Sequence, residues 1–260
     1  MITSTSNQQV KNLLQLQKKG KSRREQQLFV VEGIRMFSEI PSEWIAQIFV
    51  SESFLLANPD KLFGKEYEVL ADRVFEHVSD TKTPQGVLGV VKMPVYTLED
   101  ILKNQEGQRP MVLLLENLQD PGNLGTMFRS GEGAGVSGII MDKTTVDIFN
   151  PKVVRTTMGG IYRVPFLIVE DIKDGIRMLQ EQSIHVYAAH LEGSCCYDEP
   201  DYTTGCGFLI GNEGNGLTKE ASDMADRYIR IPMGGQLESL NAGVAASLLM
   251  YEANRQRRHA

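Results

Sequence analysis

The chain is predicted to be an α/β protein, with a parallel sheet in its C-terminal part and a smaller α/β module before it. After Pro110, compact apolar segments typical of strands alternate with segments whose apolar residues have helical spacing. The first of these strands, 111–118, is almost continuously apolar, as expected for a strand buried on both faces of a parallel sheet. In such a sheet, ligands gather at the carboxyl ends of the strands.

The first part of the chain, 1–92, has the shorter alternation of a small α/β module. Apolar residues at helical spacing predict a helix in 6–18, and LFVVEG at 28–33 reads as a strand that stops at a glycine. Residues 93–108 have a proline near their start and polar residues at their end, so we expect a linker. The remaining 109–260 form the second domain.

The other elements follow from the same signals, and Thr97 is expected to cap a short helix at its start. Strands are predicted at 46–50, 68–70, 86–92, 137–142, 164–168, 185–189, 205–211 and 227–233. Helices are predicted at 97–103, 124–134, 151–158, 172–182 and 241–257.

Composition excludes several classes of protein. No apolar run approaches the ~20 residues of a membrane span, so no membrane segment is expected. The three cysteines show no CxxC spacing and cannot all pair, which favours a reduced, cytoplasmic setting. The four histidines are scattered without a metal-ligand pattern, so no metal is expected.

The net charge and the charge distribution of the chain lead to opposite predictions about nucleic-acid binding. A net charge of −6 argues mildly against it, but cations concentrate at the two ends of the chain. These cations are Lys11, Lys18, Lys19, Lys21, Arg23, Arg24, Arg35, Arg255, Arg257 and Arg258. They are suited to meeting phosphates locally, and the alternative is an ordinary solvated helix face.

Gly133, Gly135 and Gly138 spell GxGxxG, the dinucleotide-binding pattern. That pattern must follow a strand and open a helix, whereas these glycines follow a predicted helix and open a predicted strand. We therefore interpret them as a helix C-cap and a connector. No Gly-Lys-Ser/Thr string follows the glycine-rich segment at 210–217, which excludes a phosphate-binding loop of that type there.

Three polar, glycine-containing segments carry the chemical signal. ENLQDPGNLGTMFRS at 116–130 places Asn123 and Arg129 just beyond a buried strand, where an arginine can clamp a phosphate or activate a hydroxyl. The alternative is that Asn123 caps the helix and Arg129 makes a surface ion pair.

In IGNEGNGL at 210–217 the glycines allow close backbone approach to a ligand, and Glu213 is the only acid there to hold Asn or Arg partners. The alternative is a glycine-rich turn before a helix.

The third segment, IPMGGQLESLN at 231–241, again joins a strand to a helix. Ser239 or Asn241 is placed to act chemically or simply to cap that helix. Beyond it, an apolar stripe at helical spacing predicts a core or dimer face rather than a cofactor contact. The stripe consists of Leu240, Val244, Leu248 and Tyr251.

In this order, the three segments resemble the motifs of the SpoU family of RNA ribose methyltransferases. Ala242 and Gly243 stand where the family often has larger or hydroxylated residues, which concerns helix packing more than chemistry. The module at 1–92, with its FVVEG string, looks like the RNA substrate-binding domain that precedes many such catalytic domains. The resemblance implies a deep trefoil knot in the C-terminal domain, a homodimer, and S-adenosylmethionine (AdoMet) as cofactor.

The resemblance also implies roles for individual residues. Asn123, Arg129, Glu213, Ser239 and Asn241 match the polar catalytic positions. Leu209, Gly211, Ile231, Met233 and Leu240 match the positions that hold the cofactor. Because an arginine has a pKa above ~12, a phosphate or oxyanion clamp is a better role for Arg129 than a literal base, although both stay open.

The implied activity is methylation of a ribose 2′-hydroxyl in structured RNA. The separate N-terminal module favours 23S ribosomal RNA as the substrate. The alternatives are a transfer-RNA ribose methyltransferase and a non-catalytic RNA-binding or ribosome assembly factor that retains the fold.

Overall fold

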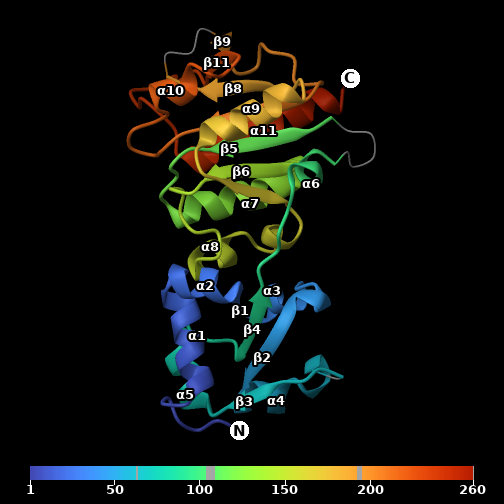
Figure 1. The fold of residues 1–260 in the computed structure, drawn as a ribbon, viewed down its shortest axis with the longest axis vertical. Coiled ribbons are helices and arrows are strands. Elements are labelled where there is room, and N and C mark those ends of the chain that lie inside the picture. The colour runs from blue at the N-terminus through green and yellow to red at the C-terminus, as the bar shows by residue number, and fades with distance from the viewer. Residues whose placement is uncertain (63, 104–108, 192–194, 260) are drawn as a thin grey trace. The chain divides into compact units, whose positions relative to one another are not determined.

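The computed structural model describes residues 1–62, 64–103, 109–191 and 195–259, and the chain divides into two compact units (Figure 1). The N-terminal unit consists of 1–95 together with 147–162, and the C-terminal unit consists of 96–146 and 163–260. The last five residues of the expected linker, 104–108, lie outside the described residues. Within the described ranges, no helix is long and apolar enough to cross a membrane.

The N-terminal unit is built on a mixed four-stranded sheet in the order β1-β4-β2-β3. Its strands are β1 Leu28–Glu32, β2 Ile45–Ser51, β3 Glu68–Leu70 and β4 Val87–Lys92. Strand β4 runs antiparallel to both β1 and β2, and β3 runs parallel to β2. The helices are α1 Gln8–Lys18, α2 Gly20–Gln26, α3 Ile34–Ser38, α4 Glu52–Ala57 and α5 Asp72–Val78, with 3-10 turns at Ser42–Trp44 and Pro59–Leu62.

The helix predicted in 6–18 from the spacing of its apolar residues is α1. Val10, Leu13 and Leu16 on α1 are buried in one cluster with Phe49 of β2 and Phe75 of α5. This apolar face of α1 therefore packs against the sheet, while its polar side remains outside.

Residues 147–162 pack into the N-terminal unit, although they stand between two strands of the C-terminal unit in the sequence. They contain α8 Pro151–Thr156 and a 3-10 turn at Gly160–Tyr162. The ring centroids of Phe149 and Phe29 lie 4.9 Å apart, and the Tyr162 hydroxyl donates to the carbonyl of Met36 at 3.2 Å. We expected this segment within a domain spanning 109–260, but its apolar contacts attach it to the other unit.

The C-terminal unit contains a seven-stranded sheet in the order β7-β6-β5-β10-β8-β11-β9, in which every pairing is parallel. The strands are β5 Met111–Leu115, β6 Gly138–Asp142, β7 Phe166–Val169, β8 His185–Ala189, β9 Cys195–Cys196, β10 Cys206–Ile210 and β11 Arg227–Arg230. Every residue of β5, β6 and β10 is buried. The predicted parallel α/β sheet is confirmed.

Helices cover this sheet (Figure 1). They are α6 Leu98–Leu102, α7 Pro121–Ala134, α9 Ile172–Glu181, α10 Lys219–Ser222 and α11 Ala242–Arg257. Helices α7 and α11 pack side by side, because Ser247 donates to Ser130 at 2.8 Å and Asn254 donates to the carbonyl of Ala134 at 3.0 Å. This pairing brings the start of α11 next to the start of α7.

Several predicted boundaries shift by a few residues. Helix α7 begins at Pro121 rather than within 122–124, because the Asp120 side chain accepts from the backbone N–H of Asn123 at 2.8 Å and caps the helix. Asn123 is therefore not the N-cap. Strand β5 ends before 116–118, where Asn117 has a φ of 51° and turns the chain. Gly135 ends α7 with a φ of 81°, which confirms the C-cap interpretation.

Candidate active site

The glycine-rich loop that follows β10 folds back on itself. A Cβ on Gly211 would lie 2.3 Å from the carbonyl carbon of Gly216, so no other residue fits there without moving the backbone. Asn212 and Gly216 exchange two backbone hydrogen bonds of 3.0 and 2.9 Å. Gly216 has a φ of 69°, a conformation that favours glycine. The loop is therefore a closed turn at the carboxyl end of a central strand.

Side chains of this loop attach it to the segment between β5 and α7. The Asn212 amide donates to the carbonyl of Asn117 at 2.8 Å. The Glu213 carboxylate accepts from the backbone N–H groups of Gln119 at 3.0 Å and Asp120 at 2.9 Å. The first and second polar segments of the sequence thus form one hydrogen-bonded structure.

Glu213 also begins a relay of side chains across all three segments. Its carboxylate accepts from the amide of Asn123 at 3.0 Å, and the carbonyl oxygen of that amide accepts from Asn241 at 2.8 Å. The prediction that Glu213 holds an asparagine is therefore confirmed. Burial acts to raise the pKa of Glu213. Hydrogen bonds from Asn123, Gln119 and Asp120 outweigh burial, so the pKa of Glu213 lies below its usual value. The carboxylate is thus ionised at neutral pH.

Asn241 closes the relay and starts α11. Its side-chain oxygen accepts from the backbone N–H of Val244 at 3.2 Å, so the capping role that the sequence left open for Ser239 or Asn241 belongs to Asn241. A Cβ on Gly243 would lie 3.4 Å from the side-chain oxygen of Asn123 and from Cβ of Thr126. The start of α11 therefore packs directly against α7 at Gly243.

Arg129 is exposed on α7, two turns beyond Asp120, and it makes no hydrogen bond or ion pair with any residue that the structure describes. The alternative interpretation as a surface ion pair therefore has no support. Ser239 is also exposed, in the segment that precedes Asn241. The relay joins three of the five predicted polar residues, and Arg129 and Ser239 lie outside it.

The five predicted cofactor positions follow or end strands at one edge of the sheet, or directly precede α11. Leu209 is buried near the end of β10, and Gly211 follows that strand directly. Ile231 and Met233 are half-buried after β11, and Leu240 is half-buried before α11. Because β11 lies two strands from β10 in a parallel sheet, these backbones share the carboxyl edge.

Sequence reasoning missed Glu116, which is buried and follows β5. Its two carboxylate oxygens accept from Thr218, at 2.8 Å from the backbone N–H and at 2.6 Å from the hydroxyl. The Thr218 hydroxyl also accepts from the N–H of Ala221 at 3.2 Å and caps α10. Glu116 thus holds the far end of the glycine-rich loop. An acid directly after an all-apolar strand was the available signal, because a buried carboxylate needs donors.

Glu116→Gln is expected to lower the free energy of unfolding by about 1–3 kcal/mol, because the glutamine amide has only one acceptor oxygen for the two donors of Thr218, its backbone N–H and its hydroxyl. Urea unfolding measures the change, with Glu181→Gln on the exposed side of α9 as the control. If Glu116→Gln and the control unfold at the same urea concentration, Glu116 does not hold the loop.

No group of three or more His, Cys, Asp or Glu side chains is arranged to hold a metal ion in the part of the chain that the structure describes. Cys195, Cys196 and Cys206 are free thiols, and burial raises the pKa of Cys206 to about 12. At neutral pH Cys206 is thus an inert thiol.

Comparison with known proteins gives matches over both units. Residues 110–251 match the SpoU rRNA Methylase family, and residues 7–89 match the MRM3-like substrate binding domain. The chain is 31% identical over 251 residues to the 23S rRNA (guanosine(2553)-2′-O)-methyltransferase RlmP of Bacillus subtilis, covering 96% of this chain and 97% of that protein.

Two solved structures resemble the whole fold. One is the AdoMet-bound rRNA methyltransferase of Sinorhizobium meliloti, with a TM-score of 0.85, 31% identity and coverage of 98% of this chain and 97% of that chain. The other is the SpoU methyltransferase AviRb of Streptomyces viridochromogenes in complex with AdoMet, with a TM-score of 0.87, 25% identity and coverage of 97% and 98%.

Proposed function

Because the chain belongs to the SpoU rRNA methylase family, we propose that it methylates a ribose 2′-hydroxyl of 23S ribosomal RNA with AdoMet as the methyl donor. The observation that carries this proposal is the relay from Glu213 through Asn123 to Asn241. It assembles three separate sequence segments at the carboxyl edge of the parallel sheet, where ligands of α/β proteins bind. The C-terminal unit is the knotted methyltransferase domain of the family.

The loops at this edge fit AdoMet chemically. Residues 211–217 and 231–241 contain no Lys, Arg or His, and each loop contains one acid, Glu213 or Glu238. Such loops suit a ligand that carries a positive sulfur and an uncharged adenosine. Backbone groups of Leu209, Gly211, Ile231, Met233 and Leu240 are proposed to hold it. When bound, AdoMet supplies a methyl group that is already activated for transfer.

The protein must then place the ribose hydroxyl in line and favour negative charge on its oxygen. We assign that task to Arg129, which is exposed and has no ion-pair partner among the described residues. A guanidinium binds the neighbouring phosphate and stabilises charge developing on the 2′-oxygen. Asn123, Glu213 and Asn241 hold the surrounding loops in position, and Ser239 contributes a hydroxyl at the rim.

Ribosomal RNA is the favoured substrate for two reasons. A curated relative that matches this chain almost end to end is named as a 23S rRNA methyltransferase. The N-terminal unit matches a substrate binding domain, so residues 1–92 are proposed to capture structured RNA. We place the reaction in the cytoplasm, where the three free thiols remain reduced.

The test is transfer of labelled methyl groups from AdoMet to total RNA from cells that lack this gene. The RNA is then fractionated by size and digested to nucleosides. A 2′-O-methylated nucleoside in the large ribosomal RNA is expected, and 2′-O-methylguanosine is expected by likeness to the Bacillus relative. Label in transfer RNA would overturn the substrate. An absence of both label and AdoMet binding would favour a non-catalytic RNA-binding factor.

We also propose a homodimer formed through α11. Three residues of its apolar stripe, Val244, Leu248 and Tyr251, are 47%, 38% and 48% exposed, so the stripe is not part of the core of its own chain. Exposed apolar side chains in a continuous row are typical of a surface that is covered by a partner.

Leu248→Glu is expected to weaken self-association by a factor of about 30 or more, the contribution of a central interface residue. Sedimentation equilibrium measures it. Leu56→Glu is the matched control, because Leu56 is 85% exposed on α4 of the N-terminal unit. A wild-type protein that sediments as a monomer would contradict the proposed dimer.

A further inference from the structure

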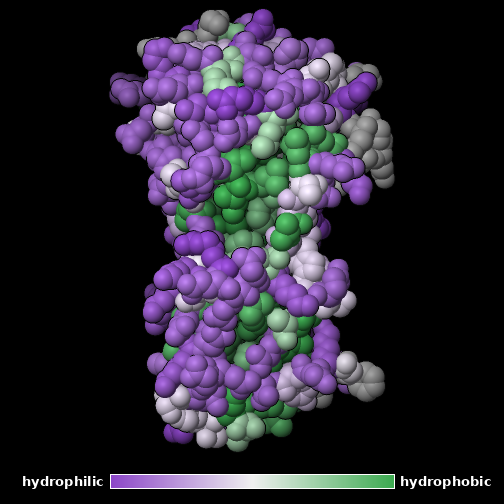
Figure 2. Space-filling model, in the orientation of Figure 1, coloured by the Kyte–Doolittle hydropathy of each residue, from purple (hydrophilic) through white to green (hydrophobic). Residues whose placement is uncertain are grey.

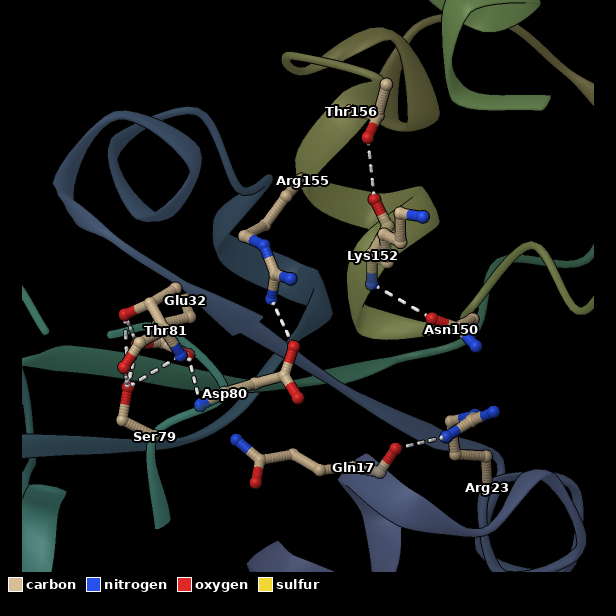
Figure 3. Close-up of polar contacts among 10 residues, drawn as sticks. All are labelled: Gln17, Arg23, Glu32, Ser79, Asp80, Thr81, Asn150, Lys152, Arg155 and Thr156. Carbon is tan, nitrogen blue, oxygen red and sulfur yellow. Dashed lines mark hydrogen bonds and ion pairs between the residues drawn. The ribbon is translucent and has the colours of Figure 1, made fainter. Parts of the chain in front are cut away.

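Residues 147–162 are bound to the N-terminal unit by two ion pairs as well as by apolar contacts. The Arg23 guanidinium donates to Asp147 at 3.0 and 2.6 Å, and it also donates to the carbonyls of Leu16 and Gln17 at the end of α1. Arg155 on α8 donates to Asp80 at 2.6 Å (Figure 3). These contacts tie the segment that contains α8 to α2 and to the turn before β4.

The turn that carries Asp80 is itself held rigidly. Glu32, the buried acid of the FVVEG string, accepts from the backbone N–H of Asp80 at 3.0 Å and from the hydroxyl of Thr81 at 2.7 Å. It also accepts from the hydroxyl of Ser79, as Figure 3 shows. Because Glu32 positions Asp80 and Asp80 positions Arg155, α8 rests on a preorganised part of the N-terminal unit.

Two cations near the contact between 147–162 and the rest of the N-terminal unit have no acid partner among the described residues. Arg24 of α2 and Lys152 of α8 are both exposed, whereas Arg23 and Arg155 are neutralised by Asp147 and Asp80. A Cβ on Gly20 would lie 3.2 Å from a guanidinium nitrogen of Arg24 and 3.1 Å from a carboxylate oxygen of Asp147. Arg24 therefore lies beside the segment that leads into α8, and Figure 2 shows a largely hydrophilic surface over α1 and α2.

We propose that α8 is part of the RNA-capturing surface, and that Lys152 and Arg24 bind phosphates of the RNA backbone there. This inference rests on the proposed function. The substrate-binding match covers only 7–89, and the methylase match includes 147–162, so neither match assigns α8 to RNA capture. The packing supplies that assignment, because α8 is a structural element of the N-terminal unit.

Lys152 and Arg24 suit phosphate binding because each carries a charge that is unpaired among the described residues, on a rigid backbone. An exposed lysine or arginine without an acid partner displaces counterions condensed on the RNA when it meets a phosphate, which favours binding. Both residues stand on helices that ion pairs and apolar contacts hold in place, so little ordering of backbone is required on binding. Two acids that contact the 147–162 segment or belong to it, Asp80 and Asp147, are already paired with Arg155 and Arg23.

The experiment is filter binding of full-length, unmodified 23S rRNA transcript to the whole protein over a range of salt concentrations. Lys152→Gln and Arg24→Gln are each expected to weaken binding about three- to tenfold and to reduce the salt slope by about one. The double variant should lose about two units of slope. KM for RNA should rise in each variant, while AdoMet affinity and kcat stay at wild-type values.

Lys61→Gln is the matched control, since Lys61 is also an exposed lysine of this unit but stands in the 3-10 turn after α4. If Lys152→Gln and Arg24→Gln bind RNA with the same affinity and salt slope as this control, α8 does not contact the RNA. That result, with wild-type protein still methylating 23S rRNA, would overturn this inference alone. A wild-type protein that methylates no RNA would overturn the proposed function itself.

Deleting 1–92 would be a poorer test. The deletion would uncover the buried faces of Ile148, Phe149 and Tyr162, which pack within the N-terminal unit. The remaining C-terminal part would then lose activity through misfolding as well as through loss of RNA binding, and the two effects could not be separated. Single substitutions on the surface avoid this difficulty.

Discussion

Arg129→Ala is expected to lower kcat for RNA methylation by about 100- to 1,000-fold, the usual effect of removing one group that stabilises charge at the reacting oxygen. AdoMet affinity should stay unchanged, because Arg129 is not among the proposed cofactor positions. The fold should also persist, since the side chain is exposed and makes no hydrogen bond or ion pair with the described residues.

Single-turnover methylation with saturating RNA measures the chemical step, and calorimetric titration measures AdoMet binding. Arg177→Ala, an exposed arginine of α9, is the control for loss of a surface charge. Arg129→Lys separates the two possible roles. A clamp should keep part of the activity with lysine, whereas a base should make the rate of the lysine variant rise with pH up to the pKa of that amine. Near-normal turnover by Arg129→Ala would remove this residue from the mechanism.

Gly211→Ala is expected to weaken AdoMet binding by about 100-fold or more, as a displacement of about 1 Å in a binding site can do. The added Cβ would lie 2.3 Å and 2.5 Å from the carbonyl carbon and oxygen of Gly216 and 2.4 Å from the nitrogen of Leu217. All three are backbone atoms, so no side-chain rotation relieves the contact. The loop must open, and Glu213 then loses its position against the segment before α7.

Gly214→Ala in the same loop is the matched control, because its Cβ would meet only the side-chain oxygen of Asn212, at an ordinary 3.5 Å. Calorimetric titration with AdoMet compares the two variants, and circular dichroism verifies that both are folded. Equal AdoMet affinity for Gly211→Ala and Gly214→Ala would show that the close approach at Gly211 has no role in holding the cofactor.

Local sequence signals predicted the elements well because the physical causes are local. Thr97 caps α6 as predicted, with a reciprocal hydrogen bond from its backbone N–H to Asp100. The glycines of the GxGxxG string also behave as predicted, since Gly135 ends α7 and Gly138 begins β6. The prediction of the start of α7 was less accurate, because several residues before it are suited to capping and only the structure identifies Asp120.

Nonlocal pairings account for what the sequence did not reveal. The bond from Asn123 to Glu213 spans ninety residues, and the pair of bonds from Thr218 to Glu116 spans about a hundred. No periodicity reports on such pairs, so Glu116 went unnoticed. The membership of α8 in the N-terminal unit was hidden for the same reason, because the partners of its segment, Phe29, Arg23 and Asp80, lie far away in the sequence.

By itself, the sequence determined the α/β class, most element boundaries and the three polar segments that identify the family. These properties depend on burial patterns, caps and glycine conformations within a few residues of one another. Only the tertiary structure decided which polar side chains meet, which acid secures the glycine-rich loop, and which unit α8 joins. Each of these depends on contacts between residues distant in sequence, whose energies arise only once the sheet and its helices have assembled.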